Sequence, residues 1–141
     1  MSAAEDLPLR GWLLAFGALR RWHRYEVVGM ERLLRRDPVL IVGYHGRPVA
    51  IDLCMLTVSL HERLGYLPHG IIHGALGRSP LLGTIVDRLG FVTGDGEGIA
   101  RVVARGEHIL VQPGGAREGC RSFRRRYQVA GASGPDTCGS P

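Results

Sequence analysis

Lysine is absent from this chain of 141 residues, and all eighteen of its basic side chains are arginine. A phosphate-binding loop that ends in Gly-Lys-Ser or Gly-Lys-Thr is therefore excluded. A lysine Schiff base to a carbonyl substrate or to pyridoxal phosphate is excluded for the same reason. The net charge is +5, which favours an anionic partner, whether a nucleic acid, a phospholipid surface or a phosphorylated substrate.

Cysteine is scarce, and the three cysteines form no Cys-x-x-Cys pair. Neither a disulfide framework nor a zinc site is supported, and a reducing, cytosolic environment fits best. Four histidines also lack the spacing of a metal site, so we expect core or surface roles for them: His61, His69, His73 and His108. We therefore expect no bound metal.

No apolar run is long enough to span a bilayer: the segment 12–19 is well short of the roughly 20 residues required. Residues 1–24 are expected to form an N-terminal apolar or amphipathic helix. Two interpretations stay open for it. The helix packs on the core of its own domain, or it lies in a membrane interface with Trp12, Phe16 and Trp22 towards the lipid and the arginines that follow near phosphates.

Beyond residue 24, strand and helix patterns alternate. This alternation predicts an α/β fold with a mainly parallel sheet flanked by helices. The strands are expected at 25–28, 39–42, 70–73, 91–93 and 108–112, and the helices at 48–64, 80–89 and 96–104. Residues 25–129 are interpreted as one domain. Residues 130–141 are mostly small, without apolar periodicity, and are expected to be a disordered tail.

A histidine and an aspartate follow the strand predicted at 39–42, in the segment from Tyr44 to Asp52. His45 has a side chain that accepts a proton near neutral pH, and the Asp52 carboxylate is suited to orient it. Seven straight helical residues would separate the two by about 10.5 Å, so a turn must bring them together. The alternative is that His45 caps a helix and Asp52 is a solvated residue.

A glycine-rich loop follows the last predicted strand, in the segment from Pro113 to Glu118. Gly114 and Gly115 leave backbone N–H groups unobstructed, and Arg117 adds a guanidinium, so the loop suits a phosphate or an oxyanion. A plain turn is the alternative. Because ligands bind at the carboxyl ends of parallel strands, both motifs are expected at neighbouring strand ends.

No nucleophile is evident, because the chain contains no Gly-x-Ser-x-Gly elbow and Cys54 falls within an apolar helix pattern. The segment 94–98 carries two acids where a phosphate would lie, so it is interpreted as a capped turn before a helix.

Together these motifs resemble those of the glycerolipid acyltransferase superfamily, with its His-x4-Asp motif and a later Pro-Glu-Gly-Thr-Arg motif. The diacylglycerol-acyltransferase-like and transmembrane-protein-68-like branch is the more similar one. Its Tyr-His-Gly and Pro-Gly-Gly-x-Arg-Glu motifs correspond here to Tyr44-His45-Gly46 and to the segment from Pro113 to Glu118.

The resemblance implies that His45 deprotonates an acceptor hydroxyl, which attacks an acyl thioester of coenzyme A or acyl carrier protein. It also implies that Asp52 orients His45, and that Gly114, Gly115, Arg117 and Glu118 form the substrate-binding loop. No cofactor is implied besides the acyl donor as co-substrate. The expected partners are the thioester, a lipid hydroxyl and the cytoplasmic face of a membrane, with nucleic acid disfavoured.

The sequence departs from the family pattern in three ways. Six residues rather than four separate His45 from Asp52, and no acceptor-binding arginine follows the segment 90–93. The chain also turns into its small-residue tail where family members continue, so a C-terminal truncation is expected. The alternative function is a non-catalytic fragment that binds lipid surfaces or nucleic acid through the basic cluster Arg117–Arg126.

Overall fold

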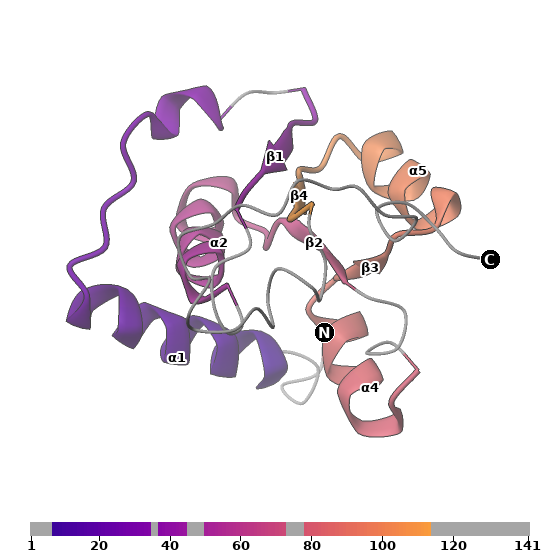
Figure 1. The fold of residues 1–141 in the computed structure, drawn as a ribbon, viewed down its shortest axis with the longest axis horizontal. Coiled ribbons are helices and arrows are strands. Elements are labelled where there is room, and N and C mark those ends of the chain that lie inside the picture. The colour runs from indigo at the N-terminus through magenta and orange to yellow at the C-terminus, as the bar shows by residue number, and fades with distance from the viewer. Residues whose placement is uncertain (1–6, 35–36, 45–49, 73–77, 114–141) are drawn as a thin grey trace, which may run out of the picture.

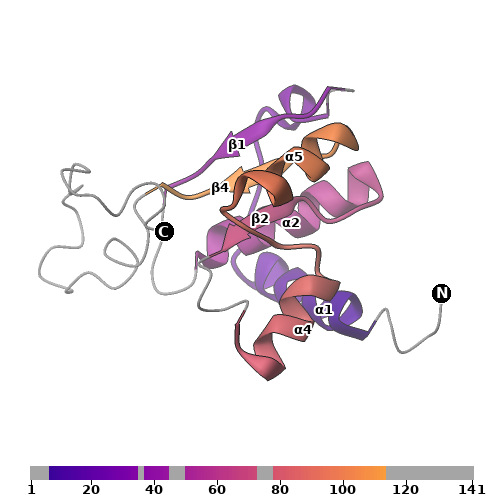
Figure 2. The same cartoon turned by 90° about the vertical axis from the view of Figure 1, so that its right-hand side faces the viewer.

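The computed structural model describes residues 7–34, 37–44, 50–72 and 78–113. These residues form a four-stranded parallel sheet with helices on both sides (Figures 1 and 2), which confirms the predicted α/β class. In chain order the elements are α1 (Leu7–Trp22), η1 (Met30–Arg32), β1 (Leu40–Val42), α2 (Ile51–Leu64), β2 (His69–Ile72), α4 (Pro80–Arg88), β3 (Val92–Thr93), α5 (Gly96–Ala104) and β4 (Ile109–Val111).

The strands are ordered β1-β4-β2-β3, so the last strand of the described chain inserts beside the first. Every pairing is parallel: Leu40 pairs with Ile109 between β1 and β4, His69 with Ile109 between β2 and β4, and Ile71 with Val92 between β2 and β3. Helices α1 and α2 lie on one side of the sheet and α5 on the other (Figures 1 and 2). Helix α4 lies near the β3 edge and contacts α1.

Most predicted elements agree with the structure to within one or two residues, but two predictions are wrong. Residues 25–28 are not a strand: the Tyr25 N–H donates to the carbonyl of Arg20, at the end of α1, rather than to a sheet. Tyr25 and Val27 face the core while Val28 is exposed. This alternation of burial resembles that of a half-buried strand, which explains the error.

Helix α2 does not begin at Pro48, because Ala50 has a left-handed backbone with φ 51° and the helix starts at Ile51. Its end agrees with the prediction, since Gly65 adopts the left-handed conformation that closes many helices, with φ 80°.

Helix α2 is the centre of the core. Its residues 55–60 are all buried, because the sheet covers one side and α1 the other. The main buried cluster joins this helix to β1 and β4 and consists of Ile41, Ala50, Leu53, Leu56, Leu60 and Leu110. The two polar residues of this buried stretch, Thr57 and Ser59, donate their hydroxyl groups to the carbonyls of Cys54 and Met55 within the helix.

Helix α1 packs on this domain, as one of the two interpretations expected. The Trp12 indole N–H donates to the Thr57 hydroxyl at 3.0 Å, and its ring meets Phe91 edge-on at 5.3 Å. Arg20 forms a bidentate pair with Glu62 at 2.6 and 2.9 Å. Trp12 therefore faces the protein rather than lipid, whereas Trp22 points into solvent.

A buried histidine connects η1 to the amino end of β4. The His108 side chain is 1% exposed, and its Nε2 lies 2.6 Å from the carbonyl oxygen of Leu33, which can only accept, so Nε2 carries the proton. Its Nδ1 lies 2.9 Å from the Tyr66 hydroxyl and forms a hydrogen bond with it. Because its ring nitrogens are satisfied, this histidine is structural, as expected.

The end of β1 and the start of α2 are held together by a contact that leaves no room for a side chain at Gly43. A Cβ atom built there would lie 2.5 Å from a methyl group of Leu53. A side chain at residue 43 would require the buried Leu53 side chain to shift.

We expect Gly43→Ala to destabilise the protein by about 1–3 kcal/mol, because the added methyl group overpacks this contact. The free energy of unfolding in urea measures the change. Gly17→Ala in α1 is the matched control, since nothing lies within 4 Å of its position, and helix propensity predicts a gain of about 0.5–1 kcal/mol. Equal stability of Gly43→Ala and wild type would contradict the packing.

Candidate active site at the carboxyl ends of β1 and β4

The two predicted motifs follow strands that are direct neighbours. Val42 of β1 pairs with Val111 of β4, and one further backbone bond joins the Gly43 N–H to the Val111 carbonyl at 2.9 Å. Beyond the strands, the Gln112 side-chain amide donates to the Tyr44 carbonyl at 3.3 Å. The segments that lead into residues 45 and 114 thus leave the sheet side by side, which confirms the prediction of neighbouring strand ends.

Most of the predicted site residues lie outside the described part of the chain: His45, Gly114, Gly115, Arg117 and Glu118, as do the basic cluster Arg117–Arg126 and the tail 130–141. Their roles stay predictions. Asp52 is described, and it is exposed in the first turn of α2. The contact between His45 and Asp52 also stays a prediction.

Asp52 lies where a carboxylate is favoured, because the first turn of a helix carries unsatisfied N–H groups and the positive end of the helix dipole. Its negative charge affects the pKa of two neighbouring residues, Tyr25 and Cys54. Burial raises the pKa of Tyr25, and the negative charge of Asp52 raises it further.

Cys54 shows the same two effects more strongly. Burial, and after it the charge of Asp52, raises the pKa of the Cys54 thiol to about 11. The thiol is protonated at neutral pH and is therefore not an activated nucleophile. This agrees with the expectation that Cys54 is a core residue.

Sequence reasoning missed two residues that shape this region. Ala50, directly before α2, is 5% exposed and holds a left-handed conformation that costs a non-glycine residue about 1–2 kcal/mol. Its carbonyl accepts from the Cys54 N–H at 3.0 Å, and its methyl group joins the main core cluster. Gln112 was predicted only as the end of a strand. No local pattern marks either residue, because both roles depend on tertiary contacts.

The segment 94–98 is a capped turn, as predicted. The Asp95 carboxylate accepts from the Gly98 N–H at 2.6 Å and caps α5. The hydrogen bond from the Thr93 hydroxyl and, after it, the one from the Gly98 N–H lower the pKa of Asp95. The carboxylate already accepts from an N–H of the helix start, and its negative charge disfavours a phosphate there.

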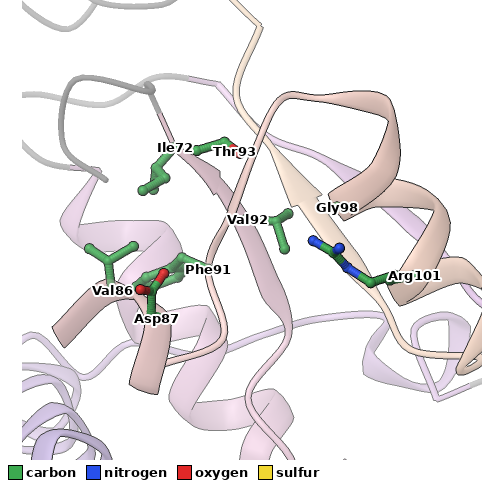
Figure 3. Close-up of a pocket in the computed structure, with 8 residues that line it drawn as sticks. All are labelled: Ile72, Val86, Asp87, Phe91, Val92, Thr93, Gly98 and Arg101. Carbon is green, nitrogen blue, oxygen red and sulfur yellow. The ribbon is translucent and has the colours of Figure 1, made fainter. Parts of the chain in front are cut away.

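A small hollow of about 120 Å³ lies at the β3 edge of the sheet, between α4, β3 and α5 (Figure 3). Asp87 and Arg101 project from opposite sides of it. Pockets for drug-sized ligands usually enclose about 300–1,000 Å³, so this one is too small for a long acyl chain. Strand β2 separates it from β4, and it is distinct from the candidate site.

Histidine and acidic side chains form no metal centre within the described residues. His69 lies at the start of β2, away from the carboxyl ends of the strands, and its Nε2 pairs with Glu107 at 2.8 Å. None of the helices in the described ranges is both long and apolar enough to cross a membrane.

Three curated proteins are similar to the chain, all with the name "DGAT1/2-independent enzyme synthesizing storage lipids". The cattle protein is 28% identical over 102 residues, the human protein 29% over 98 and the chicken protein 32% over 99. These alignments cover 69–72% of this chain but only 29–30% of each relative. No protein-family model and no solved structure matches the chain.

We expect Asp52→Asn to lower the pKa of the Cys54 thiol, because the substitution removes the negative charge that opposes its ionisation. The measurement is the rate of alkylation against pH in a Cys120→Ser, Cys138→Ser background. At a fixed alkaline pH below 11, the variant should react faster. Asp87→Asn on α4 is the control with the same change of charge. Identical pH profiles for Asp52→Asn and its parent would contradict the proximity.

Proposed function

We propose that this chain carries the catalytic motifs of an acyltransferase that moves a fatty acyl group from a thioester to a hydroxyl of a glycerolipid or a related acceptor. In this proposal His45 accepts the proton of the hydroxyl as its oxygen attacks the thioester carbonyl. The C–O bond forms, the C–S bond breaks, and the imidazolium returns the proton to the leaving thiolate. The donor is an acyl thioester of coenzyme A or acyl carrier protein, and no further cofactor is required.

One observation carries the proposal: β1 pairs directly with β4. That pairing brings together two segments that are 68 residues apart in the sequence, at Tyr44 and Gln112. A base after one strand and a glycine-rich loop after its neighbour could then act on the same carbonyl. The names of the similar proteins support lipid synthesis as the setting.

In the proposed site Asp52 is a positioning residue. It would hold the His45 imidazole in one tautomer and stabilise the imidazolium as the proton arrives. Its place in the first turn of α2, beside the tight contact of Gly43 with Leu53, supports this role, because that contact fixes the helix start against the end of β1.

The second motif would stabilise negative charge. Backbone N–H groups at Gly114 and Gly115 are suited to the thioester oxygen as it becomes an oxyanion, and Arg117 is suited to the same charge or to an acceptor phosphate. Glu118 would complete the substrate-binding loop. The raised pKa of the Cys54 thiol argues against this residue as an acyl-accepting nucleophile.

The acceptor is a lipid, and the proposed location is accordingly peripheral, on the cytoplasmic face of a membrane. The net charge of +5 supports an anionic lipid surface as partner.

We expect His45→Ala to lower the rate of acyl transfer by at least about 100-fold, because a positioned general base contributes about 10²–10⁴-fold. The assay follows thiol release from acyl-coenzyme A with lysophosphatidate, diacylglycerol or a simple alcohol in lipid micelles. Product lipid is identified by mass spectrometry, so that transfer is separated from thioester hydrolysis.

His23→Ala is the matched control, because His23 is exposed beyond the end of α1 and should leave the rate unchanged. Asp52→Asn should retain a reduced rate with a shifted pH profile. If wild type and His45→Ala form product lipid equally fast, or if wild type forms none from any acceptor, the proposal is wrong.

A further inference from the structure

Helix α1 has two apolar faces, and only one of them is used within the described structure. The inner face packs on α2 and Phe91 through the contacts of Trp12 and Arg20. The outer face exposes three large side chains: Leu7 is 68% exposed, Leu14 75% and Trp22 84%. Such exposure is expected of single apolar residues but not of an aligned series along one helix.

These exposed residues form one continuous stripe. At about 100° per residue, positions 7, 11, 14, 18 and 22 fall on one side of a helix. We define the outer stripe as the exposed residues Leu7, Gly11, Leu14, Ala15, Ala18 and Trp22. The small residues among them let the helix approach a flat surface closely.

The inner contacts fix the rotation of α1 about its axis. The Trp12 indole bonds to Thr57, and Arg20 reaches both Ser59 at 3.0 Å and the Glu62 carboxylate. Because these anchors lie eight residues apart on one face, the helix cannot roll to bury its outer stripe against α2. The stripe therefore lies on the side of α1 opposite the contacts with α2, and Figure 1 shows α2 between α1 and the strands.

The charged residues of α1 that border the stripe are positive. Arg10 and Arg21 are exposed along one border of it, Arg24 follows the helix, and α1 itself contains no acidic residue. Arg20 is paired with Glu62, so its charge is not counted among those available to a partner of the stripe. A tryptophan beside arginines at the border of an apolar stripe is typical of the boundary between lipid tails and headgroups.

We propose that the outer stripe docks on an anionic bilayer surface, with α1 in the plane of the interface and Arg10, Arg21 and Arg24 at lipid phosphates. The stripe supplies the apolar contact and the arginines supply the charge complementarity. The inference rests on the proposed function in placing the acceptor in a membrane. The docking face is the side of α1 opposite Trp12.

The test is co-sedimentation of the full chain with vesicles of phosphatidylcholine and phosphatidylglycerol, without any thioester. We expect wild type to bind, more weakly at high salt or to phosphatidylcholine alone. Leu14→Glu should weaken binding about tenfold or more, because a buried leucine contributes roughly 1.5–3 kcal/mol. Val103→Glu is the matched control: Val103 is also an exposed helical residue, 47% exposed on α5, and its variant should bind as wild type.

A second measurement locates the contact. Brominated lipids should quench Trp22 fluorescence but not that of Trp12, so Trp22→Phe should bind and lose the quenching. His45→Ala should bind as wild type, which separates docking from acyl transfer. The proposal is wrong if wild type does not bind, if Leu14→Glu binds as Val103→Glu does, or if Leu14→Glu only dissociates a dimer.

Discussion

The parallel pairing of β1 with β4 is the constraint on which the candidate site depends. It joins the first and last strands of the described sheet, through the register of Leu40 with Ile109, and places the chain exits after both at one edge. The chain segments that lead into two motifs far apart in the sequence thereby become neighbours. The hydrogen bond from Gln112 to Tyr44 extends this pairing past the strands, to the first residue of one motif and to the residue directly before the other.

Helix α2 links this edge to the rest of the fold. Its start is pressed against Gly43 by Leu53, and its buried middle separates the sheet from α1. The same helix therefore positions Asp52 near the strand end and anchors α1 through Thr57 and Glu62. A disturbance of α2 should thus affect the proposed chemistry and the proposed membrane contact together, whereas changes on the outer stripe of α1 should affect only the latter.

Much of this arrangement could be predicted from the sequence, because it follows from local patterns. Apolar runs and glycines at helix ends predicted the helices and strands, and the alternation of strand and helix predicted that the strands before the two motifs are parallel. The residues 25–28 were mistaken for a strand, since burial alternates there without sheet hydrogen bonds. The left-handed Ala50, the roles of Gly43 and Gln112, and the outward direction of Trp22 arise from tertiary contacts that no local pattern encodes.

The central claim, that the two motifs lie together at neighbouring strand ends, is tested most directly by cross-linking. Tyr44→Cys and Pro113→Cys would be combined in a chain without its native cysteines, treated with a short bismaleimide and mapped by mass spectrometry. The account predicts an efficient intramolecular link for this pair, and a weak one for Tyr44→Cys with Gly94→Cys, which follows the distant strand β3. Equal yields for the two pairs, or a stronger link to position 94, would contradict it.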